Sequence, residues 1–206
     1  MMKVIGLTGG SGTGKTTVAE HLESRGAVRI DADEIAHELV EKDDEVARKI
    51  RLRFGEGILT EGRIDRKKLG AIVFTESRAR EDLNAIVHPA VIEACLEKLE
   101  ECRKTAVELV VIDAALLLEV PTPFEFDLVI ALRAPRRERV RRLLAKGGVT
   151  RAEIDARLSS QGNLEKSFYK ADAVVDTNKS LSAVLEEVEN LVQSLLGHES
   201  EGEGDG

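Results

Sequence analysis

The sequence predicts an α/β fold in which a parallel sheet is flanked by helices. Short apolar runs typical of buried strands alternate with segments of helical periodicity along the 206 residues. Strands that alternate with helices form parallel sheets that are covered on both faces. A further stretch, from about residue 34 to residue 105, has helical periodicity and no convincing strand. It is too long for a single crossover and therefore predicts an inserted helical subdomain.

The individual elements follow from local patterns. Buried strands are expected at residues 3–8, 27–31, 107–112, 127–132 and 173–176, and helices outside the insert at 16–25, 136–145, from 150 onward and at 181–195. Glycines at Gly26 and Gly197 are typical of helix ends. Thr150 and Glu153 have the spacing of a capping box. Pro89 suits the first position of a helix, so we expect the last helix of the insert to begin there.

Composition and cysteine spacing argue against a membrane-spanning, a secreted or a zinc-binding protein. The chain is 42% hydrophobic and 33% charged, which is ordinary for a soluble domain, and no apolar run could span a bilayer. The first apolar run, Lys3–Thr8, is followed directly by glycines and is too short for a secretory signal. We therefore expect a cytoplasmic protein without a membrane partner. Cys95 and Cys102 lie too far apart on one predicted helix for a disulfide, and no zinc-ligand cluster occurs.

The acidic net charge comes partly from the C-terminal tail. The formal net charge is −8, and residues 198–206 consist largely of glycine and acidic residues. Such a composition cannot bury apolar surface. We therefore expect a disordered acidic tail at 198–206 and a single domain over residues 1–197.

The clearest motif is a glycine-rich phosphate-binding loop between the first strand and the first helix. Residues 9–16 read GGSGTGKT, which matches the pattern G-x-x-x-x-G-K-[ST]. Successive backbone N–H groups and the helix N-terminus attract an anion. Lys15 is expected on the β- and γ-phosphates of ATP, and the Thr16 hydroxyl on Mg²⁺. The residues predicted to bind ATP are Gly10, Ser11, Gly12, Thr13, Gly14, Lys15, Thr16 and Thr17.

Other nucleotide-binding classes fit this motif less well. A dinucleotide-binding turn needs a third glycine where Lys15 stands. The guanine-reading element of GTPases is Asn-Lys-x-Asp, whereas residues 178–181 read NKSL and lack the carboxylate. A glycine-rich turn that binds nothing is the remaining alternative. The complete motif in its strand–helix context favours a nucleoside-triphosphate site.

Carboxylates follow two of the predicted strands. Asp31 and Asp33 end the second strand and alternate to the same side, beside the expected phosphate loop. One of them, with Asp33 favoured, can accept the proton of an attacking hydroxyl; the alternative is that they cap the following helix. Asp113 ends the third strand, where a metal-linked carboxylate is expected in phosphate-loop enzymes, the alternative being a simple turn former.

An arginine-rich segment lies between Arg133 and Lys146, with seven basic residues and one acidic residue. Three interpretations compete: a solvated helix face, a nucleic-acid-binding surface, or a mobile lid that closes arginines on the triphosphate. The acidic net charge and scarce aromatic residues weaken the second. Arg142 and Lys146 share one helix face, and Gly147 and Gly148 provide a hinge. The sequence therefore predicts a lid in which Arg142 is catalytic.

Taken together, the motifs resemble the dephospho-coenzyme A kinase family over about residues 3–195. The phosphate loop alone is generic, whereas the other segments in this order are much more specific. The matching segments are Gly6–Thr17, Ile30–Asp33, Asp65–Leu69, Val73, Phe74, Val87–Pro89, Val111–Asp113, Leu116, Leu117, Gln161, Lys166 and Ala171–Asn178.

The resemblance implies a P-loop kinase fold and a specific reaction. The γ-phosphate of ATP would be transferred to the ribose 3′-hydroxyl of dephospho-coenzyme A, the last step of coenzyme A synthesis. It implies an acceptor-binding helical insert at residues 34–106 and a lid region at 136–170. Catalysis would use Asp33, Lys15 and Arg142, and the acceptor side would include Asp31, Arg66 and His88. Mg²⁺ would be linked to Thr16 and Asp113.

The chain departs from the family pattern in two places, and two alternatives stay open. Ala115 stands where a proline is frequent, and Lys146-Gly147 stands where Arg-Asp is frequent. Lysine cannot reproduce the two-pronged hydrogen bonding of arginine. Another small-molecule or nucleoside kinase would share the loop and the lid. A nucleic-acid-binding module would use the arginine run and show no ATP turnover, and we expect no nucleic-acid partner.

Overall fold

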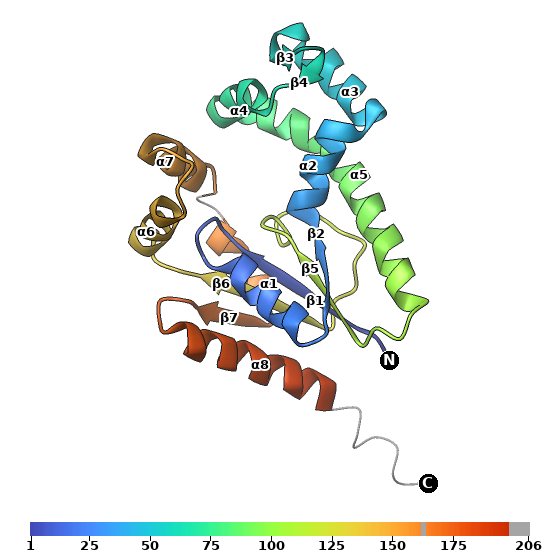
Figure 1. The fold of residues 1–206 in the computed structure, drawn as a ribbon, viewed down its shortest axis with the longest axis vertical. Coiled ribbons are helices and arrows are strands. Elements are labelled where there is room, and N and C mark those ends of the chain that lie inside the picture. Colours follow the sequence, from blue (N-terminus) through green and yellow to red (C-terminus); the bar gives the residue numbers. More distant parts are fainter. Residues whose placement is uncertain (162–163, 198–206) are drawn as a thin grey trace. The chain divides into compact units, whose positions relative to one another are not determined.

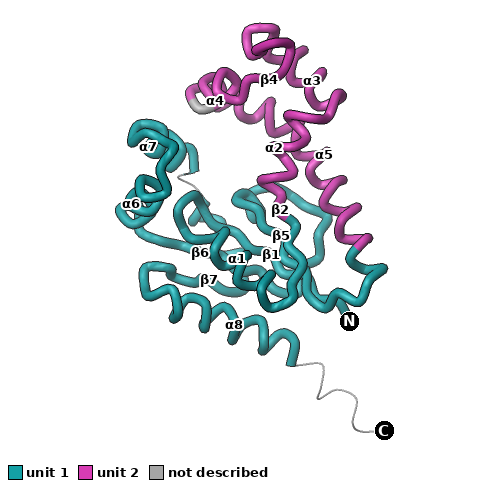
Figure 2. Tube along the Cα trace, viewed as in Figure 1, with its two compact units in different colours: residues 1–30, 102–206 teal, residues 31–101 magenta. Residues whose placement is uncertain are grey.

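A computed structural model describes residues 1–161 and 164–197, apart from the side chain of Phe74. The predicted acidic tail at 198–206, and residues 162–163 of the predicted lid region, lie outside the described residues. The chain forms two compact units (Figures 1 and 2). The first comprises residues 1–30 and 102–206, and the second comprises residues 31–101.

The first unit is built on a five-stranded sheet whose strand order is β2-β5-β1-β6-β7. The strands are β1 (Lys3–Gly9), β2 (Val28–Asp31), β5 (Leu109–Asp113), β6 (Leu128–Arg133) and β7 (Ala173–Asp176). β1 pairs in parallel with both β5 and β6, and β6 pairs in parallel with β7. The central strand β1 is buried from Val4 to Gly9, as expected for a strand covered on both faces. The predicted α/β fold with a parallel sheet is confirmed.

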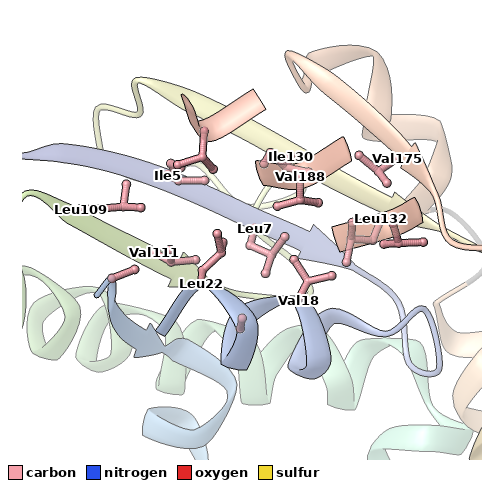
Figure 3. Packing of buried hydrophobic residues seen from close by; sticks show 14 residues of the cluster. Ile5, Leu7, Val18, Leu22, Leu109, Val111, Ile130, Leu132, Val175 and Val188 are labelled. Carbon is pink, nitrogen blue, oxygen red and sulfur yellow. The ribbon is translucent and has the colours of Figure 1, made fainter. Parts of the chain in front are cut away.

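Helices α1 (Lys15–Ser24) and α8 (Leu181–Gly197) pack against this sheet. Figure 3 shows how side chains from both helices and from four strands form one cluster. Its labelled members are Ile5, Leu7, Val18, Leu22, Leu109, Val111, Ile130, Leu132, Val175 and Val188. The core therefore fixes the end of β1 relative to the start of α1, which are the two elements that flank the glycine-rich loop.

Two further helices of this unit form a small layer of their own. α6 (Arg136–Lys146) and α7 (Arg151–Ser160) pack through the buried residues Val140, Ile154 and Leu158. Thr150 and Glu153 satisfy each other's backbone N–H groups, so the predicted capping box at the start of α7 is confirmed. A 3₁₀ segment, Leu164–Lys170, precedes β7.

The second unit is mostly helical and has its own core. Its helices are α2 (Ala32–Lys42), α3 (Asp44–Phe54), α4 (Arg66–Thr75) and α5 (Ser77–Arg103), the last of which ends two residues beyond the unit. A 3₁₀ turn, Glu56–Ile58, follows α3. The core includes Ile50, Ile58, Leu69 and Val87.

Two expectations for this segment were wrong. It contains a small antiparallel pair, β3 (Leu59–Thr60) with β4 (Arg63–Ile64). Two-residue strands are too short to show a periodicity. Pro89 does not begin a helix but lies inside the 27-residue α5. Proline removes one backbone hydrogen bond from a helix interior, and burial of Val87 just before it and of Cys95 beyond it provides packing that offsets this loss.

Leu22 offers a direct test of the packing that holds α1 on the sheet. Its side chain is 2% exposed. Leu22→Ala keeps a good helix former, so the loss should come from packing alone, and we expect a decrease of about 2–5 kcal/mol in the free energy of unfolding. Glu23→Ala, at an exposed position of the same helix, should change it by less than about 0.5 kcal/mol. Urea unfolding followed by circular dichroism measures both; equal effects would contradict the described core.

Candidate active site

The glycine-rich loop begins at Gly9, the last residue of β1, and runs through residues 10–14 to α1. Gly12 has φ +79° and Gly14 has φ +95°, both in the left-handed region that favours glycine. Thr13 closes the turn, since its N–H and its hydroxyl both donate to the carbonyl oxygen of Gly10, at 3.2 and 2.8 Å. The loop thus leads into the N-terminus of α1, and Lys15 is the first residue of that helix.

Lys15 and Asp113 come together, since β1 and β5 are neighbouring parallel strands. The Lys15 ammonium forms a hydrogen-bonded ion pair with Oδ1 of Asp113. The Asp113 side chain has no exposed surface, and that of Lys15 is 13% exposed. A buried carboxylate is tolerated only when it is paired, so this contact holds Lys15 beside the loop.

A second cation reaches the same carboxylate and was missed from the sequence. Arg29 on β2 donates from Nη2 and Nε to Oδ2 of Asp113, at 2.6 and 3.2 Å. Its side chain is 15% exposed. The strand order β2-β5-β1 places Asp113 at the end of the middle strand. Arg29 approaches from one neighbouring strand, and Lys15 follows the other.

Ser11 is held by two side chains from α6 and from the residue that follows α7. Its N–H donates to Oε1 of Gln161 at 2.9 Å, and its hydroxyl accepts from Nε2 of Gln161 at 3.2 Å. Its carbonyl oxygen accepts from Nε of Arg139 at 2.8 Å. Arg139 also donates to Oε1 of Gln161 at 3.0 Å. Backbone and side chain of Ser11 are therefore fixed together, and both partners are brought in from more than 100 positions along the chain.

This packing explains two of the loop glycines. A Cβ atom at Gly10 would collide with the guanidinium of Arg139, and one at Gly12 would lie 2.7 Å from the backbone oxygen of Arg139. The collision at Gly12 is with backbone and could not be relieved cheaply, whereas at Gly10 the guanidinium of Arg139 would have to give up its hydrogen bonds to Ser11 and Gln161. Gly10 and Gly12 therefore permit close approach of α6 to the loop, in addition to the backbone freedom that anion binding requires.

Arg142 lies on carbonyl oxygens of the loop. Its Nη1 donates to the Thr13 oxygen at 3.2 Å, and its Nη2 donates to the Thr177 oxygen at 2.7 Å, while Nε pairs with Glu138 at 3.0 Å. The hydroxyl of Thr177, which is buried, also donates to the Thr13 oxygen. Phosphates are bound by loop N–H groups. In this arrangement Arg142 stabilises the loop from its carbonyl side.

The remaining predicted residues belong to the second unit. Asp31 is the N-cap of α2, because its Oδ1 accepts the N–H of Glu34 at 2.9 Å, while Asp33 is exposed in the first turn of the helix. Arg66 is the exposed first residue of α4. His88 is half-buried, and burial lowers the pKa of its imidazole.

The described part of the chain offers few oxygen ligands for a metal ion beside the loop. Within residues 1–161 and 164–197, no three His, Cys, Asp or Glu residues gather as a metal site. Mg²⁺ in phosphoryl-transfer sites is bound by one or two protein oxygens together with phosphates. Thr16 is exposed next to the loop, and Asp113 is buried in contact with Lys15. These two residues fit such a partial donor set, with the Asp113 oxygens shared with Lys15 and Arg29.

The fold and this loop define the class of the protein. A parallel sheet whose central strand leads through GGSGTGKT into a helix, with its lysine against a strand-end aspartate, is the site of a phosphate-loop nucleotide-binding protein. A model of the dephospho-CoA kinase family matches residues 3–183. The chain therefore belongs to the dephospho-CoA kinase family, a family of phosphotransferases.

Individual relatives agree with this assignment. A dephospho-CoA kinase from Geobacter sulfurreducens is 43% identical over 178 residues, covering 86% of this chain and 90% of that protein. The crystal structure of TT1252 from Thermus thermophilus has a TM-score of 0.78 at 30% identity, covering 94% of this chain and 97% of that one. Dephospho-CoA kinase from Campylobacter jejuni has a TM-score of 0.65 at 26% identity and covers 96% of this chain and all of its own. No helix among the described residues is long and apolar enough to cross a membrane.

Arg139 provides a test of the Ser11 contacts. The residue is 8% exposed. Arg139→Ala removes its hydrogen bonds to Ser11 and Gln161, and we expect the free energy of unfolding to fall by about 1–3 kcal/mol. Arg137→Ala, exposed on the same helix, should change it by less than about 0.5 kcal/mol. Denaturant unfolding of both variants checks this, and two equally stable variants would show that the contacts contribute little.

Proposed function

We propose that this protein transfers the γ-phosphate of ATP to the ribose 3′-hydroxyl of dephospho-coenzyme A, forming coenzyme A. The observation that carries the proposal is family membership across residues 3–183 together with an intact phosphate loop. The relatives cover nearly the whole chain, so an activity that requires the second unit is compatible with the match.

Each part of the first unit has a role in this reaction. Backbone N–H groups of the loop would bind the phosphates, and Lys15 would neutralise charge on the β- and γ-phosphates. Thr16 and Asp113 would hold Mg²⁺, which supplies charge neutralisation on the phosphate oxygens. Arg142 is proposed to act on the transferring phosphoryl group, which requires it to exchange a carbonyl contact of the loop for a phosphate oxygen. We propose residues 136–170 as the lid.

The second unit would supply the acceptor side. We propose the insert at 34–106 as the acceptor-binding part, with Asp31, Arg66 and His88 among its contacts. One oxygen of Asp31, Oδ1, caps α2 by accepting the N–H of Glu34. Asp33 lies two residues further on and is exposed. These environments support Asp33 as the general base.

Several arginines of the run are paired with acidic side chains. Arg141 pairs with Glu138, and Arg136 pairs with Asp155, which also accepts Arg151. The hydrogen bond from Arg141 is the main cause that lowers the pKa of Glu138 to about 2, so that this carboxylate stays ionised at neutral pH. These pairs favour a solvated helix face for the outer arginines. They support a small-molecule acceptor over a polynucleotide.

The proposal is tested with a panel of acceptors. Purified protein is given MgATP with dephospho-coenzyme A, nucleosides or shikimate, and ADP release and the phosphorylated product are measured. We expect rapid turnover with dephospho-coenzyme A alone, and a decrease of about 10²-fold or more in kcat/KM for Lys15→Ala. Faster phosphorylation of a nucleoside or of shikimate would overturn the assignment of the acceptor.

Asp33 and Asp31 are distinguished by isosteric amides. Asp33→Asn keeps the shape but loses the basicity, and kcat should fall by about 10²–10⁴-fold while ATP affinity barely changes. Asp31→Asn should cost less, because an asparagine oxygen can still cap α2. Steady-state kinetics and ATP titrations measure both. The reverse ranking would make Asp31 the base.

Arg142 is tested against Arg137 on the same helix. A guanidinium on the transferring phosphoryl group contributes roughly 10³-fold or more to the rate, so Arg142→Ala should lower kcat strongly. It should also lower the Tm, because its bonds to Thr13 and Thr177 are lost. Arg137→Ala should do neither. A lowered Tm with kcat within about twofold of the unmodified protein would limit Arg142 to loop support.

A further inference from the structure

Asp113 carries one negative charge and contacts two positive ones. Its Oδ1 accepts from Lys15, and its Oδ2 accepts from both Nε and Nη2 of Arg29. The three side chains, here called the Asp113 cluster, are 0%, 13% and 15% exposed, in the order Asp113, Lys15, Arg29. The cluster therefore sets two cations on one carboxylate, at the edge of the sheet where the phosphate loop begins.

ATP competes with Asp113 for one of these two cations. Lys15 belongs to the phosphate loop, and its ammonium must move from Asp113 to the phosphates to perform the role proposed above. Leaving a buried carboxylate without a cation is costly, because the carboxylate loses its counter-charge in a region of low water access. Arg29 remains on the other oxygen, so the carboxylate stays paired after Lys15 leaves.

We infer that Arg29 is a positioning residue for ATP binding, which releases Lys15 to the phosphates by holding the charge of Asp113. This inference rests on the proposed function only in requiring ATP at this loop. Arginine suits the role because its guanidinium is always charged and directs two donors at one oxygen. Its position on β2, across β5 from the loop, keeps it on the opposite side of Asp113 from Lys15.

The inference makes a specific prediction about pairs of substitutions. In Arg29→Met, Lys15 becomes the one cation of the cluster that balances Asp113, and ATP must compete with that carboxylate for it. In Asp113→Asn, Lys15 is released in any case. The double variant Arg29→Met/Asp113→Asn has no buried carboxylate to balance, so it should bind ATP like Asp113→Asn alone.

The experiment is a calorimetric titration with ATP in the presence of EDTA, so that a metal-linked role of Asp113 does not contribute. We expect Arg29→Met to weaken ATP binding by about 10-fold or more. Asp113→Asn should bind ATP at least as tightly as the unmodified protein. The affinity of the double variant should match that of Asp113→Asn within about threefold. Arg25→Met is the matched control. The Arg25 side chain is 64% exposed and pairs with Glu189, so its substitution should leave ATP affinity unchanged.

Three outcomes would overturn the inference. Unchanged affinity in Arg29→Met would show that Lys15 needs no such help. A double variant that stays about 10-fold or more weaker than Asp113→Asn would show that Arg29 acts on the nucleotide directly or through the fold. This second comparison holds even if Arg29→Met alone fails to fold, because neither of its members retains the buried carboxylate.

ATP binding without phosphorylation of dephospho-coenzyme A would overturn the proposed function alone, and a lack of ATP binding would overturn both.

Discussion

The site depends on one buried carboxylate. Asp113 has no exposed surface, and it is held by Lys15 from the phosphate loop and by Arg29 from β2. A charge in that position must be paired. The pairing joins strands β2 and β5 to the start of α1, at the edge where parallel strands end and ligands bind in α/β folds. The lysine of the phosphate loop is thereby held beside the loop by a buried partner.

The loop around this lysine is supported from outside as well as from the sheet. Arg139 and Gln161 bind Ser11, while Arg142 and Thr177 bind the Thr13 carbonyl oxygen. These contacts orient loop carbonyls toward α6 and β7 and leave the turn in a fixed conformation before any phosphate arrives. Pre-arranged dipoles need no reorganisation during phosphoryl transfer. The same helix that is predicted to form part of the lid therefore also helps to shape the loop.

The features that could be predicted from the sequence are those that depend on residues close together along the chain. The GGSGTGKT motif, Asp113 at a strand end and the Thr150 capping box depend on neighbours along the chain, and each could be predicted. Arg29, Arg139 and Thr177 could not, because their roles depend on contacts with residues 84 or more positions away. Within the insert, local rules misled the prediction at Pro89, where packing along α5 outweighs the missing backbone hydrogen bond.

The most direct test is a crystal structure of the protein with ADP. The ammonium of Lys15 should lie within hydrogen-bond distance of a β-phosphate oxygen, while both donors of Arg29 remain on Asp113. The N–H groups of the loop should surround the same phosphate, and Gln161 should still hold Ser11. Lys15 still paired with Asp113, and a nucleotide bound away from residues 9–16, would contradict the site described for this chain.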